Sequence, residues 1–368
     1  MHAPTQRERL KDVFEGRRPG RIPWTADLTY WQAGRAALGI LPESYRGPEG
    51  LARLHHDTGT GRTFYVRSPV VAERDTSLFR HKEVVEGDTV RHTWVTPEGT
   101  LSGRFRRAGH GTSLAPIAYP VKSIADVPAM VCWYEGAHYR PSYDGYFQSD
   151  REFGEDGLPV VTTERTPLAE FVVGWAGVSN FTYMTADAPV ELERAFDRLR
   201  QAQLPMWGIL ATGPGLAVEI GDNLSAAVQA SFFRRYSFGY YQHVAGLMHS
   251  AGKKLGVHID GTLRGLLEQL PRAGLDFVES VTPAPVGDMT CEEARRAVGP
   301  DCILIGGVPG AMFAPPFDWP LMRDHVHEAV RAFGSDGGFV LSSADQVPPD
   351  GDIELVHLIA QEMDALRY

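Results

Sequence analysis

From Leu158 to the C-terminus, short apolar runs alternate with longer amphipathic stretches. The apolar runs predict strands at residues 159–163, 207–220, 254–260, 276–281, 302–308 and 338–342. Helices are expected at residues 190–202, 231–251, 263–273, 290–298, 318–333 and 353–366. Repeated βα units of this length imply parallel strands joined by right-handed crossovers. The chain is therefore predicted to form an α/β fold, either a (β/α)8 barrel or an open doubly wound sheet.

Two features favour the barrel, in a single domain that spans residues 1–368. No G-x-G-x-x-G motif opens a helix after a strand, which weakens the alternative of a dinucleotide-binding sheet. A barrel of 368 residues is also an ordinary size for one domain, and no low-complexity linker divides the chain. We therefore expect a TIM barrel.

The first part of the chain, up to about residue 110, does not follow this repeat. Thr5 and Glu8 form a capping box ahead of an amphipathic helix. Residues 89–95 and 100–106 resemble two strands joined by turn residues at 97–99, which predicts a β-hairpin. The barrel is thus expected to carry an N-terminal extension and an inserted hairpin.

Net charge and cysteine content limit the classes of function. The formal net charge is −10, whereas a nucleic-acid-binding protein normally carries a basic stripe. The three cysteines have no C-x-x-C spacing, which fits a reducing cytosol rather than a disulfide framework. No apolar run approaches the roughly 20 residues that cross a bilayer, and the N-terminus lacks the apolar segment of a secretory signal. We expect a cytoplasmic protein that binds neither nucleic acid nor a membrane.

Polar side chains are concentrated where the predicted strands end, which is where barrels carry their chemistry. We expect Glu219, Asp222, His258 and Asp260 to converge there. His258 and Asp260 are two residues apart on one strand, so both point to the same face. An imidazole with carboxylates could bind zinc or act as an acid–base pair. Alternatively, His258 pairs with a core carboxylate and Asp260 caps a helix that begins near residue 262.

Aromatic residues near the N-terminus are candidates for a substrate pocket. Trp24, Tyr30 and Trp31 lie close in sequence to Asp27, and Asp345 follows the last predicted strand. These five residues are predicted to bind substrate at the barrel mouth. The alternative for the aromatics is that they only pack the N-terminal segment across the barrel.

Several motifs together resemble the uroporphyrinogen decarboxylase superfamily. They are H-I-D-G at 258–261, G-L-D at 274–276, P-A-P-V-G-D-M-T at 283–290, C-I-L-I-G-G-V at 302–308, T-P-E-G-T at 96–100 and the ending S-S-A-D-Q-V-P-P-D at 342–350. The resemblance runs from about Arg21 to the C-terminus. It implies a (β/α)8 barrel and one of two activities: porphyrinogen decarboxylation without metal, or zinc-dependent methyl transfer to or from a corrinoid protein.

Departures from the family motifs bear on the choice between these activities. The segment W-Q-A-G-R at 31–35 echoes the decarboxylase signature R-Q-A-G-R, but Trp31 replaces its first arginine. A substrate with many carboxylates needs such cationic partners. Methyltransferases that act on coenzyme thiols carry H-x-C and a distant cysteine, whereas this chain has His258-x-Asp260 and no cysteine near Ser342.

The branch that demethylates aromatic methyl ethers resembles this chain better. Some members space their zinc ligands as E-x14-E-x20-H, which falls here on Asp222, Ser237 and His258. The resemblance therefore implies Asp222 and His258 as zinc ligands, with the middle ligand replaced. We expect Asp260 as the third ligand, with Glu219 or Asp345 as alternatives.

The main hypothesis is a corrinoid-dependent methyltransferase, the methyl-transferring component of an O-demethylase. It would move a methyl group from a small methoxylated substrate of aromatic type to a Co(I) corrinoid protein, with Zn²⁺ as Lewis acid. His258 and Glu219 are its predicted catalytic residues. Its expected partners are the corrinoid protein and the substrate, and a homodimer is left open. Two alternatives stay open: a metal-free decarboxylase-like lyase that uses Asp27, Glu219 and His258, and a barrel that binds a small molecule without turnover.

Overall fold

The computed structural model describes residues 4–62, 65–108, 113–336 and 338–366. Nine strands form one parallel sheet in the order β2-β1-β15-β14-β13-β12-β11-β10-β3. Their bounds are β1 (Trp24–Ala26), β2 (Gly61–Arg62), β3 (Tyr65–Arg67), β10 (Val160–Thr163), β11 (Ala217–Leu224), β12 (Lys254–Ile259), β13 (Phe277–Val281), β14 (Ile303–Pro309) and β15 (Phe339–Ala344).

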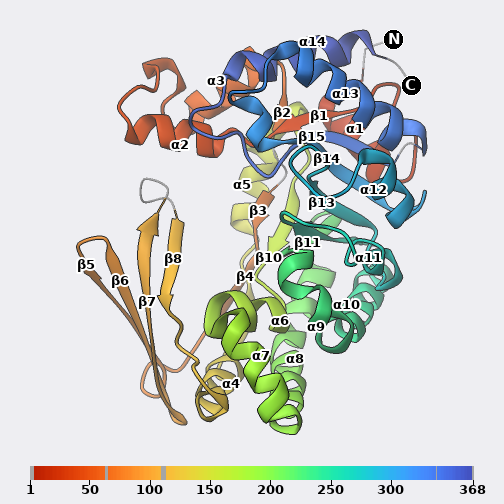
Figure 1. Ribbon diagram of the computed structural model, residues 1–368. Helices are drawn as coiled ribbons and strands as arrows, with labels where there is room; N and C mark the ends of the chain where they lie inside the picture. Colours follow the sequence, from red (N-terminus) through yellow and green to blue (C-terminus); the bar gives the residue numbers. More distant parts are fainter. Residues whose placement is uncertain (1–3, 63–64, 109–112, 337, 367–368) are drawn as a thin grey trace.

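The sheet is curled, because its two edges belong to one short stretch of chain (Figure 1). β2 pairs in parallel with β1, and β3 pairs in parallel with β10 at the other edge. Arg62 and Tyr65 are three residues apart, so their Cα atoms lie within about 11 Å of each other. The two edges are therefore neighbours. The expected α/β fold of barrel type is confirmed in so far as the strands form a curled parallel sheet.

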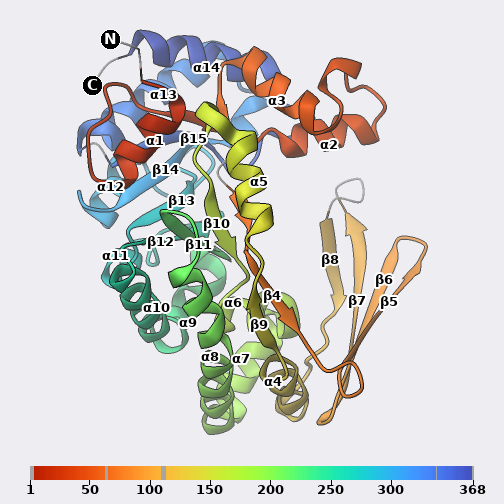
Figure 2. The ribbon, with the colours of Figure 1, turned by 180° about the vertical axis from the view of Figure 1, so that it is seen from behind.

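Helices surround this sheet (Figures 1 and 2). They are α1 (Gln6–Phe14), α2 (Thr29–Ala37), α3 (Gly47–Thr58), α4 (Val127–Glu135), α5 (Asp144–Phe153), α6 (Pro167–Ala169), the π-helical turn η5 (Glu170–Ala176), α7 (Gly177–Asp187), α8 (Pro189–Thr212), α9 (Ala226–Tyr236), α10 (Phe238–Ser250), α11 (Gln269–Arg272), α12 (Cys291–Val298), α13 (Trp319–Phe333) and α14 (Ile353–Ala365). None of the helices in the described ranges combines the length and the apolar composition that a membrane crossing needs.

The first helix covers the amino-terminal end of the strands. The predicted capping box is present, since Thr5 and Glu8 each bond the other's backbone amide. Leu10, Val13 and Phe14 are buried against residues at the strand starts, and the rings of Phe14 and Phe277 lie 5.3 Å apart. This end of the barrel is therefore filled, and the opposite end is left for the site.

Three of the predicted elements are wrong in their bounds. Residues 207–212 belong to the long helix α8, and strand β11 begins at Ala217. Trp207 and Leu210 are buried on one face of that helix, and a short apolar run suits a buried helix as well as a strand. The helix expected at 231–251 is divided at Ser237 into α9 and α10, and residues 263–273 contain only the short α11.

A four-stranded antiparallel sheet stands beside the barrel (Figures 1 and 2). Its strands are β5 (Arg80–Glu86), β6 (Thr89–Thr96), β7 (Gly99–Ala108) and β8 (Ser113–Ala118), and the predicted hairpin corresponds to β6 and β7. The sheet is anchored by Trp94, whose ring centroid lies 4.8 Å from that of Trp175 in η5. The strands before and after this sheet in the chain, β4 (Val70–Glu73) and β9 (His138–Pro141), pair with each other as a two-stranded antiparallel ribbon.

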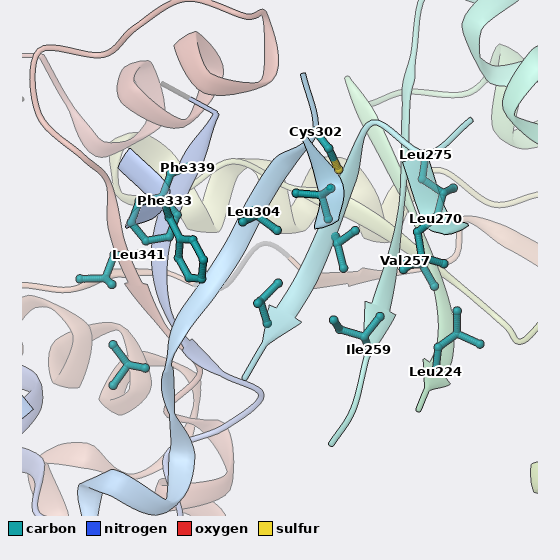
Figure 3. Packing of buried hydrophobic residues seen from close by; sticks show 14 of the residues in the cluster. Leu224, Val257, Ile259, Leu270, Leu275, Cys302, Leu304, Phe333, Phe339 and Leu341 are labelled. Carbon is teal, nitrogen blue, oxygen red and sulfur yellow. The ribbon is translucent and has the colours of Figure 1, made fainter. Parts of the chain in front are cut away.

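The main core lies between the strands and their outer helices. Figure 3 shows Val257 and Ile259 of β12 among the apolar side chains of this layer, with Leu224 and Leu270 close by. Burying each such side chain contributes about 1.5–3 kcal/mol. Because side chains alternate along a strand, placing Val257 and Ile259 in the outer layer turns His258 to the inside of the barrel.

Candidate active site

His258 is held inside the barrel by a carboxylate on the next strand. Its Nδ1 donates to Oε2 of Glu279 over 2.5 Å, and the two residues are register partners between β12 and β13. Burial alone would lower the pKa of His258, but the charge of Glu279 and the hydrogen bonds of Asp260 and Glu279 raise it well above its ordinary value. The pairing of His258 with a core carboxylate, one of the two alternatives above, is thus present.

Glu219 enters the same space from β11. Its side chain is fully buried, and neither carboxylate oxygen has a hydrogen-bond partner among the described residues. Burial, followed by the charge of Glu279, raises the pKa of Glu219 well above the ordinary value, while His258 and the nearby Thr162 hydroxyl lower it. A buried carboxyl group without partners is costly, so this position calls for a proton or a cation.

Glu219, His258 and Glu279 together form a group that could hold a metal ion. Each offers one ligand atom, and the three atoms lie within 4.8 Å of one another. In the part of the chain that the structure describes, no other trio of histidine, cysteine, aspartate or glutamate is arranged in this way. One nitrogen and two carboxylate oxygens are a usual donor set for catalytic zinc, and the unpartnered oxygens of Glu219 fit that role.

Asp222 lies outside this group, although the sequence suggested it as a metal ligand. It follows Glu219 by an odd number of residues on the same strand, so the two side chains point to opposite faces. Both of its oxygens are engaged: the amide and hydroxyl of Thr166 donate to them over 2.6 and 2.5 Å, and the Tyr241 hydroxyl donates as well. Asp222 therefore links Thr166, in the segment that follows β10, with Tyr241 on α10.

Asp260 lies beside the group at its open side. Oδ1 of Asp260 is 3.6 Å from Nε2 of His258, and Oδ2 accepts from Nδ2 of Asn223 over 2.6 Å. Burial would raise the pKa of Asp260, but His258 and Asn223 hold it below its ordinary value. Its side chain is 40% exposed, unlike the buried groups of the trio.

The site opens into a cavity of about 350 Å³. Its lining consists of Asp27, Thr162, Thr163, Glu164, Arg165, Glu170, Glu219, Gly221, Asn223, His258, Asp345 and Gln346. A second cavity, of about 760 Å³, shares Asp27, Thr162, Thr163 and Glu164 with it. The reacting groups are therefore reached through a space large enough for a small molecule.

The structure brings two of the predicted substrate-binding residues to this cavity. Oδ1 of Asp27 accepts from the amide and hydroxyl of Thr29, and Oδ2 accepts from Nε2 of Gln346 over 3.0 Å. Asp345 has a left-handed backbone conformation, with φ of 62°. Burial raises the pKa of Asp345 to about 6, against the lowering effect of His258.

The three predicted aromatic residues are not among the described residues that line this cavity. Trp24 and Trp31 are buried in the main core, and Nε1 of Trp31 donates to the carbonyl oxygen of Gly351 over 2.9 Å. Tyr30 is half-buried on α2. Trp24 and Trp31 therefore pack the N-terminal segment against the barrel, which was the alternative considered for these residues.

Three residues of the site were not predicted. Glu279 lies in the middle of β13, the strand after the one that carries His258, and an acidic residue within this apolar run was the available signal. Arg165 and Glu170 follow β10 and have no spacing that marks them. Glu170 begins the π-helical turn η5, a rare form that often occurs at functional sites. Burial raises the pKa of Glu170 to about 7, opposed by the charge of Arg165.

The fold and this site define an α/β enzyme of barrel type with a buried carboxylate–histidine centre. Residues 167–366 match the model of the uroporphyrinogen decarboxylase family, more than half of the chain. The chain belongs to the uroporphyrinogen decarboxylase family, which confirms the resemblance found in its motifs.

Comparison with solved structures supports the fold. A methyltransferase from Methanosarcina mazei has a TM-score of 0.58 and 15% identity, covering 98% of this chain and 99% of that chain. Two D-psicose 3-epimerase structures, one from Clostridium cellulolyticum H10, have TM-scores of 0.29 and 0.30 with 10% and 13% identity. They cover 56% and 60% of this chain and 77% and 82% of theirs, and such low scores carry no argument. No curated protein matches the chain in sequence.

Proposed function

We propose that the protein is a methyltransferase that takes a methyl group from a small methoxylated substrate of aromatic type. The acceptor is a Co(I) corrinoid carried by a partner protein, and Zn²⁺ is the Lewis acid. The observation that carries this proposal is the buried group of Glu219, His258 and Glu279, with ligand atoms within 4.8 Å. Likeness of fold to a methyltransferase over 98% of the chain adds support.

The ligand set that we propose differs from the one expected from sequence spacing. Glu219, His258 and Glu279 would hold the ion, and Asp260 stands beside them. Asp222 is left out, because its oxygens already accept from Thr166 and Tyr241. When bound, Zn²⁺ would polarise the ether oxygen and stabilise the leaving phenolate or alkoxide.

The protein's own residues prepare the site for that chemistry. The hydrogen bond between Nδ1 of His258 and Glu279 brings two of the proposed ligands together, and an ion held by both residues would replace this bond, with the imidazole neutral. Glu219 is fully buried, so its electrostatic interactions are stronger than they would be in water. Asp345, with a pKa of about 6, can hold or release a proton beside the leaving oxygen near neutral pH.

The charge of the cavity argues against a porphyrinogen substrate. Its lining carries the carboxyl groups of Asp27, Glu164, Glu170, Glu219 and Asp345. Among the described lining residues, Arg165 is the only arginine or lysine. A substrate with many carboxylates would meet more like charges than opposite ones, so the decarboxylase alternative lacks the partners that it needs.

Zinc content and methyl transfer test the proposal together. The purified protein is analysed for zinc, then incubated with methoxylated aromatics and cob(I)alamin, and methylcobalamin formation is followed by absorbance. We expect about one zinc per chain, and we expect His258→Ala to lose both the zinc and the transfer. His325→Gln is the matched control, because His325 is also buried but bonds the backbone of Gly307.

Full activity in protein stripped of metal would refute the zinc mechanism. Decarboxylation of a porphyrinogen would instead establish the lyase alternative. Tight binding of a small molecule without turnover, even with a corrinoid protein supplied, would favour the non-catalytic barrel.

A further inference from the structure

Arg165 occupies a distinctive position in the site cavity. It follows β10 by two residues and lines the cavity together with Glu219 and His258. No other arginine or lysine is found among the described lining residues. Besides the imidazole of His258, Arg165 is therefore the positive donor that the described lining offers to a ligand in this cavity.

The guanidinium of Arg165 is not used by the described part of the protein. Its Nε is buried and has no hydrogen-bond partner, and Arg165 forms no ion pair with a described carboxylate. Its charge nevertheless lowers the pKa of Glu170, Asp222 and Asp260. These acids thus feel the charge of the guanidinium without forming an ion pair with it. Because unsatisfied buried donors are costly, such a group indicates a ligand.

The backbone of Arg165 is fixed from behind by a chain of hydrogen bonds. Nε2 of Gln203 donates to the Arg165 carbonyl over 3.0 Å, and the Tyr240 hydroxyl donates to Oε1 of Gln203 over 3.0 Å. The indole of Trp207 donates in turn to the Tyr240 oxygen over 2.8 Å. All three supporting residues are buried, so Arg165 starts from a rigid base. Fixing the backbone beforehand reduces the entropy that is lost when the side chain binds a ligand.

We propose that Arg165 binds a carboxylate group on the substrate. A guanidinium offers paired N–H donors that match the two oxygens of a carboxylate. The cavity of about 350 Å³ accommodates a substrate of about one ring, and one unpaired arginine suits one carboxylate. The methoxylated substrate is then an aromatic acid, with its carboxylate at Arg165 and its methoxy group toward Glu219 and His258. The assignment of the methoxy end rests on the proposed function.

Binding measurements on the zinc-loaded protein without corrinoid test this inference. Titration calorimetry compares 4-methoxybenzoate with 4-methoxybenzamide, which has the same shape but no charge. The wild-type protein is expected to prefer the acid about 10-fold or more, since hydrogen bonds to charged groups are the strong ones. Arg165→Gln is expected to weaken binding of the acid about 10- to 100-fold and leave the amide nearly unchanged. Arg165→Lys should keep part of the preference.

Arg35→Gln is the matched control. Arg35 is also half-buried with an unpartnered Nε, but it lies over Trp31 on α2 and outside this cavity. The Arg35→Gln variant should bind both compounds as the wild type does. The inference is overturned if the wild type binds neither compound or shows no preference for the acid, if Arg165→Gln keeps the preference, or if Arg35→Gln loses it. The binding experiment measures no methyl transfer. A failure of the proposed function would therefore be seen in the transfer assay, where no methylcobalamin forms although the binding preference for the acid is intact.

Discussion

Replacing Glu219 with glutamine tests whether the buried group binds zinc. The substitution keeps the size of the side chain and removes a carboxylate whose oxygens have no hydrogen-bond partner among the described residues. If Glu219, His258 and Glu279 hold the ion, Glu219→Gln removes one of three protein ligands. Zinc should then stabilise the wild-type protein against heat and stabilise the variant far less.

The size of the shift follows from mass action and chain length. Zinc at 100 times its dissociation constant stabilises the folded state by about 2.7 kcal/mol. A chain of 368 residues unfolds with an entropy of about 0.8 kcal/mol per kelvin, at about 2.1 cal/mol/K per residue. The melting temperature of the wild type should therefore rise by about 3–4 °C. For Glu219→Gln at the same zinc concentration we expect a rise of about 1 °C or less.

Scanning fluorimetry with and without zinc, at one pH, measures both shifts. Glu170→Gln is the control, because Glu170 lines the same cavity but is not one of the three grouped residues. It should show the full shift of the wild type. An equal zinc-induced shift in Glu219→Gln and the wild type would refute the assignment of the metal site.

Three further substitutions separate structural roles from site roles. Asp222→Ala leaves the Tyr241 hydroxyl and other buried donors without an acceptor, so it should lower stability by about 3–5 kcal/mol in denaturant unfolding while leaving zinc content at the wild-type level. Burial lowers the pKa of His55 to about 4, so the unfolded chain binds more protons at this residue between that pH and about 6.5, and His55 contributes a loss of about 3 kcal/mol as pH falls through this window. Glu170 and Asp345, whose pKa values are raised, act in the opposite direction, so the loss is measured as the difference between the wild type and His55→Gln. His55→Gln should flatten that loss, and an unchanged pH profile would contradict it. Gly306→Ala places a Cβ 2.6 Å from the Val281 amide at a φ of +137°, so it should sharply reduce the yield of folded protein, and a normal yield would contradict the close contact between β13 and β14 at this position.

The fold was predictable where apolar runs were short and bounded by turn residues. The strands expected at 254–260 and 276–281 are observed as Lys254–Ile259 and Phe277–Val281. The segment 207–220 was harder, because its apolar residues first complete a buried helix face and then form a strand. Local pattern does not distinguish these two environments, and only packing of Trp207 against the barrel decides between them.

The candidate site was predictable in its strands but not in its ligand set. His258 and Glu219 could be found because both stand near the ends of the strands predicted at 254–260 and 207–220. Asp222 was expected as a ligand because its spacing from His258 matched a family motif, whereas in the structure its oxygens accept from Thr166 and it lies outside the group of three. Glu279 was identifiable only as an acidic residue within an apolar strand, since its pairing with His258 depends on the register between β12 and β13. That register becomes known only when the sheet is assembled.

Charge balance in the assembled site bears on the two activities of the family. Glu219 and Glu279 bring two buried carboxyl groups to one imidazole. His258 can offset one negative charge through its bond to Glu279, and Glu219 then remains without a hydrogen-bond partner in the described ranges. Within a low-dielectric site, a divalent cation offsets that charge and gains three ligands at once. A decarboxylase for a polycarboxylate would need the opposite arrangement, with arginines facing the substrate. The surplus of acid at the strand ends therefore favours metal-assisted methyl transfer over metal-free decarboxylation.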